Sequence, residues 1–288
     1  MLFYPKNENE DAQIALIIPR YQGKWLYINY EGRKTFTFPT GYRKENESLA
    51  DAADRVLREE SGALDFSVWP VSAFGALQKD GTVHGELFFA DIRQMGRVLS
   101  EKVTERCLFD EPEEDYRAKN VQRQLLDKVE KWLIDERTLL FCISAAETSA
   151  SRILKTYEAC RIDGVISSPE KTIRAAMNHL AEDRDLTVSA NPDMGENFAE
   201  DFRRKGIEVF REILDWEKGR SLAIGMHEDA VGSILEKYKA WLKADTENLY
   251  AKYYREESGS ASKANVTVLL EFIEDKLIGV RDSWTKES

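Results

Sequence analysis

The sequence is poor in the residues from which disulfide frameworks and zinc sites are built. Its 288 residues include only three cysteines, and Cys107, Cys142 and Cys160 are too widely spaced for a disulfide framework or a CxxC metal site. The three histidines show neither HxH nor HxxxH spacing, which argues against zinc. Few, scattered cysteines are typical of a reducing compartment, so we expect a cytoplasmic protein.

Long apolar segments are absent as well. No run of apolar residues approaches the roughly 18–20 that a membrane-spanning helix needs. The first residues have neither a basic stretch nor a long apolar one, which argues against a secretion signal. A membrane is therefore not an expected partner. The chain of 288 residues is long enough for two globular domains, each with a core of its own.

Positive charge is in deficit. The chain has 41 Lys and Arg residues against 52 Asp and Glu residues, a formal net charge of −11, and its basic residues are interspersed with acidic ones. A protein that binds a nucleic-acid polymer needs clustered Lys and Arg to neutralise phosphates. The composition therefore excludes such a polymer as an expected partner. It leaves small anionic ligands open, because a metal ion or a local arginine can override the overall charge.

Hydrophobic periodicity predicts a β-rich first half with a well-defined helix. Apolar residues between 12 and 30 lie on either side of Gln22-Gly23, which predicts a β-hairpin. A helix is predicted from Ser48 to Ser61, because apolar residues recur at three- and four-residue intervals between a capping Ser48 and a capping Gly62. The other predicted elements are strands at Thr35–Phe38, Phe66–Ala76 and His84–Ile92, a turn at 79–81, an acidic loop at Phe109–Arg117 and a helix at Asn120–Asp135.

The pattern changes near residues 135–137, where we place a domain boundary between residues 1–136 and 137–288. Strands then alternate with helices, which favours a largely parallel α/β sheet. The strands are predicted at Leu139–Ile143, Val165–Ser167, Leu186–Ser189 and Leu222–Met226, with single helices at 150–161, 170–182 and 229–243, more than one helix across 197–218, and a closing hairpin at Asn265–Arg281. The expected fold class is α/β throughout.

One pattern in the first domain carries chemistry. It fits G-x5-E-x7-R-E-U-x-E-E-x-G-U, where U is an apolar residue, at every fixed position except one. The matching residues are Gly41, Glu47, Arg55, Leu57, Glu59, Glu60, Gly62 and Ala63. The exception is Val56, where the pattern has Glu. An amphipathic surface helix that happens to end in acidic residues is the plainer interpretation.

The spacing explains what the pattern can do. Positions 56, 59 and 60 share one helix face, and carboxylates there can hold Mg²⁺ or Mn²⁺, which prefer oxygen ligands. Such an ion bridges diphosphate oxygens and activates water. Gly41 is expected to let the backbone turn sharply and to offer its carbonyl to the metal. The pattern thus predicts a metal–diphosphate site at Gly41, Glu59 and Glu60.

This pattern, with the strands around it, resembles the Nudix hydrolases over roughly residues 10–135. The resemblance implies an α+β sandwich with a mixed sheet and Mg²⁺-dependent or Mn²⁺-dependent cleavage of a nucleoside diphosphate linked to another group. It assigns catalytic roles to Glu47, Arg55, Glu59 and Glu60, and metal binding to Gly41, Glu59 and Glu60.

Two departures from the family pattern bear on activity. Val56 removes a carboxylate that contributes to metal binding or proton transfer in the family, and general-base help is worth about 10²–10⁴-fold in rate. Thr40 stands where the family has a second glycine, a milder change. A base can also come from outside the pattern, and the acidic residues that could supply it are Glu86, Glu105, Glu113 and Glu114.

Residues 138–286 resemble the histidine phosphatases, whose three-layer α/β fold opens with a strand followed by Arg-His-Gly-Glu-Thr. Here the strand is followed by Ser144-Ala145-Ala146-Glu147-Thr148, so the nucleophilic histidine is replaced by Ala145. The other positions that the resemblance maps are Ser144 and Thr172 in place of phosphate-binding arginines, Glu196 in place of the acidic proton donor, and His227 as the second histidine. Without a nucleophile and these arginines the usual phosphoryl transfer is lost. A histidine satisfied at a strand end is the plainer interpretation of His227.

Two hypotheses follow for the whole chain. The first is a Nudix-type hydrolase with an inactive phosphatase-like domain. The second is a non-catalytic pseudoenzyme that binds a nucleotide, a phosphorylated ligand or a partner protein. Aromatic residues of the first domain could stack on a base, although strand aromatics are more often core. These residues are Trp25, Tyr27, Tyr30, Phe36, Phe38, Trp69 and Phe74. A homodimer stays open.

Overall fold

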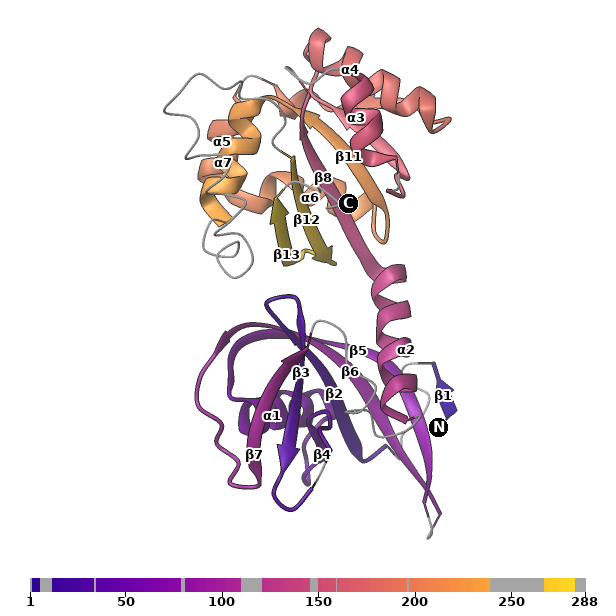
Figure 1. The fold of residues 1–288 in the computed structure, drawn as a ribbon, viewed down its shortest axis with the longest axis vertical. Coiled ribbons are helices and arrows are strands. Elements are labelled where there is room, and N and C mark those ends of the chain that lie inside the picture. The colour runs from indigo at the N-terminus through magenta and orange to yellow at the C-terminus, as the bar shows by residue number, and fades with distance from the viewer. Residues whose placement is uncertain are drawn as a thin grey trace. The chain divides into compact units, whose positions relative to one another are not determined.

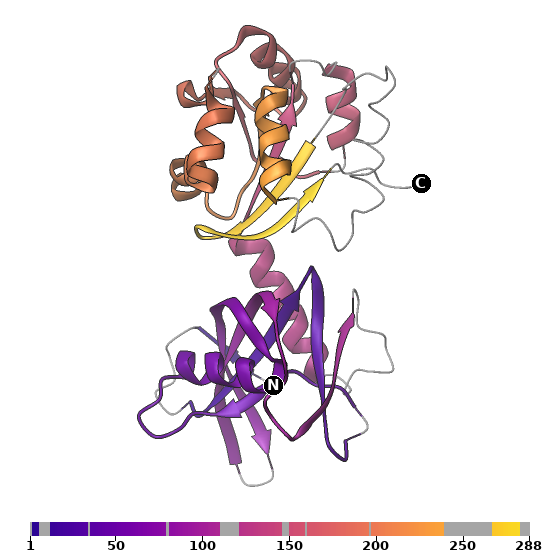
Figure 2. The same ribbon diagram turned by 90° about the vertical axis from the view of Figure 1, so that its left-hand side faces the viewer.

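The structure is a computed structural model, and it describes residues 2–5, 12–33, 35–78, 81–109, 121–145, 150–158, 160–195, 197–238 and 267–282. The chain divides into two compact units, Met1–Asp135 and Glu136–Ser288. Each contains a sheet and helices, which confirms the α/β fold class (Figures 1 and 2). Within the described ranges, no helix is long and apolar enough to cross a membrane.

The first unit is built on a seven-stranded mixed sheet with the order β1-β5-β6-β2-β3-β7, and β4 pairs with β2. β2 and β6 are parallel, whereas the other neighbours are antiparallel. The strands are β1 (Leu2–Tyr4), β2 (Ile14–Tyr21), β3 (Lys24–Tyr30), β4 (Thr40–Tyr42), β5 (Ala63–Gln78), β6 (Gly81–Met95) and β7 (Val103–Phe109).

The hairpin predicted at Gln22-Gly23 is confirmed. β2 and β3 pair up to Tyr21 and Lys24, and both turn residues have positive φ, 53° for Gln22 and 79° for Gly23. Two such residues make a turn whose twist matches that of the flanking strands.

The prediction of a strand at Thr35–Phe38 is wrong. This segment makes only an isolated bridge, between Thr37 and Ile28, and the next strand, β4, begins after it at Thr40. The pairing of this segment with β3 does not continue beyond Thr37, because Pro39 has no N–H to donate to a ladder. The Pro39 carbonyl instead accepts a hydrogen bond of 3.0 Å from the Ile17 N–H of β2. The chain thus passes from β3 to β2, and this switch sets the position of β4.

The helix predicted at Ser48–Ser61 is confirmed as α1 (Leu49–Ser61). Ser48 caps it, accepting from the Asp51 N–H while Asp51 accepts from the Ser48 N–H. At the other end Gly62 is left-handed, with φ 74°, and its N–H donates to the Arg58 carbonyl at 3.1 Å. The apolar face of α1 packs on the sheet (Figure 1), and its buried residues are Ala52, Ala53, Val56 and Leu57.

Other predicted boundaries of this unit were partly wrong. β5 and β6 are longer than predicted, and β1 and β7 were missed, since β1 is very short and β7 is an edge strand with no buried residue. Lys79, Asp80 and most of the acidic loop lie outside the described residues. The last helix is α2 (Val121–Glu136), in which the apolar Val121 is 43% exposed, whereas the polar Gln122 is buried and donates to the Phe36 carbonyl.

The second unit has a six-stranded sheet with the order β10-β9-β11-β8-β12-β13. The first four strands of this order are mutually parallel, and β12 and β13 form the predicted antiparallel hairpin. The strands are β8 (Arg137–Ser144), β9 (Gly164–Ser167), β10 (Val188–Ala190), β11 (Ser221–Met226), β12 (Thr267–Ile273) and β13 (Lys276–Asp282).

Helices cover both faces of this sheet, as Figures 1 and 2 show. α3 and α4 bury their apolar side chains against one face, and α5 and α7 lie on the other. The helices are α3 (Ala150–Tyr157), α4 (Lys171–Asp183), α5 (Phe198–Lys205), α6 (Arg211–Trp216) and α7 (Glu228–Tyr238), with short 3-10 turns η2 (Pro192–Met194) and η3 (Gly206–Phe210). The helices predicted across 197–218 are thus confirmed as α5, η3 and α6, and α5 ends at Gly206, whose φ is 67°.

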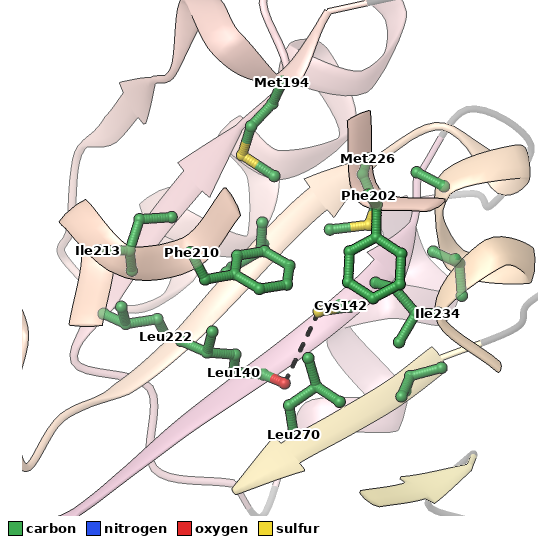
Figure 3. Packing of buried hydrophobic residues seen from close by; sticks show 14 of the residues in the cluster. Leu140, Cys142, Met194, Phe202, Phe210, Ile213, Leu222, Met226, Ile234 and Leu270 are labelled. Carbon is green, nitrogen blue, oxygen red and sulfur yellow. Dashed lines mark hydrogen bonds between the residues drawn. The ribbon is translucent and has the colours of Figure 1, made fainter. Parts of the chain in front are cut away.

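Alternate residues of β8 point to opposite faces of the sheet in the second unit. Leu140 and Cys142 of β8 point into the core beneath α5 and α7, where they meet Phe202, Phe210 and Ile234 (Figure 3). The Cys142 thiol is completely buried, and it lies 3.9 Å from the Leu140 carbonyl. Burial raises the pKa of this thiol, so Cys142 is a packing residue rather than a reactive one.

Candidate functional site

The loop before α1 is tied to the helix by Glu47 and Arg55. Arg55 Nε donates to Glu47 Oε1 at 2.7 Å, and Arg55 Nη2 donates to Glu47 Oε2 at 2.9 Å. Nη2 also donates to the Tyr42 carbonyl of β4 at 2.9 Å. The guanidinium lowers the pKa of Glu47 to about 2. Both Glu47 oxygens are therefore engaged within the protein, and the pair braces the loop against the helix.

Glu59 and Glu60 occupy the last turn of α1. Glu60 Oε2 accepts hydrogen bonds from the Tyr30 hydroxyl at 2.7 Å and from the Thr40 N–H at 3.1 Å. Burial raises the pKa of Glu60, and the neighbouring charge of Glu59 adds to that rise. The Glu59 carboxylate is half-exposed and lies 3.5 Å from Arg55 Nη1. The helix therefore ends in two carboxylates, one half-buried and anchored, the other near solvent.

Gly41 does not make the sharp turn that the sequence led us to expect. It lies in the extended strand β4, paired with Ala15 of β2, and its φ is not positive. The left-handed residue of the loop is Asn46, with φ 64°. Gly41 is required for space instead, because a Cβ there would lie 2.4 Å from Val56 Cγ2. Val56 itself is 2% exposed.

The site has two carboxylates where the family pattern has three. Among the residues that the structure describes, no group of three or more acidic, histidine or cysteine side chains is arranged to hold a metal ion. Val56 fills the position where a third carboxylate would complete the set. Two adjacent carboxylates remain, Glu59 and Glu60, and such oxygen donors suit one hard divalent cation such as Mg²⁺ or Mn²⁺.

The acidic residues outside the pattern that could act as a base lie on different strands of the first unit or outside the described residues. Glu86 lies on β6 in register with Ala15, which is itself in register with Gly41. Phe88 and Ala90, which follow at two-residue intervals, pack against α1, so Glu86 is on the same face of the sheet. Glu105 is exposed on β7, beside Cys107. Glu113 and Glu114 lie outside the described residues.

The aromatic residues of this unit are mainly core. Tyr27 packs on Phe38 with ring centroids 4.4 Å apart, and Trp69 stacks on Phe89 at 5.8 Å. Of the seven aromatics considered for base stacking, six are buried and Tyr30 alone is half-buried. Tyr30 is also the residue that the sequence did not connect with the site, because its contact with Glu60 joins positions 30 residues apart.

In the second unit, three of the mapped phosphatase positions lie at the carboxyl ends of two neighbouring strands. Ser144 ends β8, Ala145 follows it, and His227 follows β11. The Ala145 N–H donates to the Met226 carbonyl at 3.2 Å, which brings the two strand ends together. In open α/β sheets ligands bind at this carboxyl edge. Ala145 is buried, and a methyl group stands where a nucleophile would be needed.

The remaining phosphatase positions are less informative. Thr172 is exposed in the first turn of α4, and Glu196 lies outside the described residues. The His227 ring is 45% exposed, and its Nδ1 accepts from the Asp229 N–H at 3.3 Å. His227 is thus satisfied locally, next to the strand end, as its plainer interpretation expects.

Comparisons with known proteins concern the first half of the chain. No family model matches the sequence. A segment of 79 residues is 33% identical to the putative 8-oxo-dGTP diphosphatase YtkD of Bacillus subtilis, and it covers 27% of this chain and 49% of that protein. The chain thus spans about half the length of this curated relative.

Solved structures similar to the chain include the pyrophosphohydrolase BsRppH of Bacillus subtilis, with a TM-score of 0.40 and 23% identity over 46% of this chain and 97% of that one. The NUDIX domain of Shewanella oneidensis NrtR, solved with ADP ribose, has a TM-score of 0.37 and 16% identity over 45% and 92% of the two chains.

Proposed function

We propose that the first unit is a Nudix-type pyrophosphohydrolase that cleaves a nucleoside diphosphate linked to another group. The observation that carries this proposal is the joint fixation of loop and helix, by Arg55 on Glu47 and by the Thr40 N–H on Glu60. It sets the acidic end of α1 against β4. The likeness to a putative 8-oxo-dGTP diphosphatase, over about half of that protein, supports a nucleotide substrate.

Within this proposal the side chains have distinct roles. Glu59 and Glu60 would hold one Mg²⁺ or Mn²⁺, which would supply charge neutralisation at the diphosphate. Glu47 and Arg55 would keep the loop in register with the helix. Val56 offers no proton acceptor, so turnover is expected to be slower by about 10²–10⁴-fold than with a carboxylate at that position.

The test is a turnover assay on a panel of nucleotides that includes 8-oxo-dGTP and ADP-ribose, with Mg²⁺ or Mn²⁺. We expect metal-dependent release of a nucleoside monophosphate, and loss of that release in Glu59→Gln and Glu60→Gln. Asp54→Asn, on the exposed face of α1 where Asp54 pairs with Arg58, is the matched control and should keep the activity.

A second candidate is a nucleotide-binding protein without catalysis. The observation in its favour is Val56, since a buried aliphatic group replaces the third carboxylate. It predicts no turnover anywhere in the panel together with ligand-induced thermal stabilisation, which follows from binding to the native state alone. That combination would refute the hydrolase.

The second unit belongs to the proposal as a histidine phosphatase-like domain without phosphatase activity. Ala145 has no lone pair with which to attack phosphorus, and Ser144 and Thr172 provide no guanidinium. The unit would then bind a ligand or contact a protein partner in the cytoplasm. Hydrolysis of p-nitrophenyl phosphate by the Glu60→Gln variant would contradict this part of the proposal.

A further inference from the structure

Tyr30 at the end of β3 reaches the acidic end of α1. Its hydroxyl donates to Glu60 Oε2 at 2.7 Å, a length typical of a strong hydrogen bond to a carboxylate. We propose that Tyr30 is a positioning residue, which orients Glu60 so that its other oxygen, Oε1, would be left to hold a metal ion. This inference rests on the proposed function, because it assigns a role to Tyr30 in the same site.

The arrangement of donors around Glu60 supports this role. The Tyr30 hydroxyl and the Thr40 N–H converge on the same oxygen, Oε2, from two different strands. No hydrogen bond from a described residue reaches Oε1. Because a carboxylate is planar, two donors that fix one oxygen also fix the direction of the other. Oε1 is therefore the atom with lone pairs left for a cation.

Tyr30 is itself held in place. Its ring is half-buried against the core beneath α1, and the Arg33 guanidinium carbon lies 5.2 Å from the ring centroid. The Arg33 N–H donates to the Tyr30 carbonyl at 3.0 Å, and the Glu31 N–H donates to the Lys102 carbonyl at 2.8 Å. The hydroxyl therefore meets Glu60 from a fixed support, with little freedom to move away.

The loss of a carboxylate at position 56 makes this support more important. Groups that hydrogen-bond to a metal ligand typically change metal affinity by about 10–100-fold when they are removed. A site with fewer carboxylates depends more on the correct orientation of those that remain. Here Glu60 is the anchored carboxylate of the pair, and Tyr30 is the side chain that anchors it.

The test is a Mn²⁺ titration of the full chain, with free and bound Mn²⁺ distinguished by electron paramagnetic resonance. Tyr30→Phe removes only the hydroxyl, and we expect it to weaken Mn²⁺ binding by about 10-fold or more. Tyr21→Phe is the matched control, since Tyr21 also packs at the α1 core and, among the described residues, its hydroxyl accepts a hydrogen bond from Gln22 Nε2 alone. Its Mn²⁺ affinity should be unchanged.

Three outcomes separate the possibilities. Unchanged Mn²⁺ binding in Tyr30→Phe, together with loss of binding in Glu60→Gln, would overturn the role of Tyr30 and leave the proposed function standing. Unchanged binding in Glu60→Gln would refute the metal site and the proposed function with it. A lower melting temperature of Tyr30→Phe with unchanged Mn²⁺ affinity would show a purely structural hydrogen bond, and would also overturn the inference.

Discussion

Gly41 of β4 and Val56 of α1 lie in direct contact, and the absence of a side chain at Gly41 leaves room for the Val56 side chain. A Cβ on Gly41 would be 2.4 Å from Val56 Cγ2, closer than real Cβ contacts come. The glycine thus lets a buried aliphatic side chain of α1 approach the backbone of β4. The helix is docked at this point by apolar packing, where the family pattern has a carboxylate.

Replacing Gly41 with Ala tests this contact. The added methyl group forces either Val56 or β4 to move, and overpacking of this kind costs about 1–3 kcal/mol of unfolding free energy. Urea denaturation of Gly41→Ala, Val56→Ala and the double variant measures the coupling. We expect the double variant to be more stable than the two single costs predict, by about 0.5–3 kcal/mol. Strict additivity would show that the two residues do not press on each other.

The Glu47–Arg55 pair predicts a pH dependence. The pKa of Glu47 in the folded protein is lowered to about 2 from an ordinary value of 4.5, so the pair stabilises the fold above about pH 4.5. That contribution is lost as the pH falls from 4.5 towards 2. The stability difference between wild type and Glu47→Gln in urea should therefore shrink between pH 7 and pH 3. Glu45→Gln, an exposed residue of the same loop, is the control and should differ little from wild type at either pH.

The start of α1 depends on the Ser48 side chain. Ser48 Oγ accepts from the Asp51 N–H at 3.0 Å, so Ser48→Ala leaves a helix donor without its partner. We expect a loss of about 1 kcal/mol in unfolding free energy, and a much smaller loss for Ser48→Asn, which retains a capping oxygen. Equal stability of the Ala and Asn variants would indicate that solvent replaces the cap.

The proposed mapping of the second unit onto the histidine phosphatases predicts that a single substitution gives no phosphatase activity. Ala145→His restores a nucleophile beside β11, but Ser144 and Thr172 still provide no guanidinium to hold a phosphate. We expect no hydrolysis of p-nitrophenyl phosphate above the wild-type background. Substantial turnover by Ala145→His would mean that other residues bind the phosphate, and that the mapping of these positions is wrong.

Much of the fold could be predicted where local signals decide the structure. Ser48 and Gly62 define the ends of α1 through their own backbone and side chains, and Gln22-Gly23 defines the hairpin. β7 was missed because edge strands need not alternate apolar and polar residues. The polar Gln122 is buried on α2 because its side chain donates a hydrogen bond to the distant Phe36 carbonyl. Such outcomes depend on neighbours that periodicity does not describe.

The candidate site was predictable in its residues but only partly in its geometry. Spacing alone assigned Glu59 and Glu60 to one end of a helix. The expectation that Gly41 makes a sharp turn was wrong, because the pattern does not reveal that β4 continues through it. The bond between Tyr30 and Glu60 could not be foreseen, since it depends on how β3 packs against α1.

The most direct test of an assembled site that lacks one carboxylate is to restore it. Val56→Glu should raise the metal-dependent hydrolysis of a nucleotide substrate by about 10²-fold or more, because general-base help is worth about 10²–10⁴-fold. Val56→Gln, of the same size but without a charge, should give no increase. If Val56→Glu folds and binds Mn²⁺ yet hydrolyses no nucleotide faster than Val56→Gln, the proposed hydrolase site is contradicted.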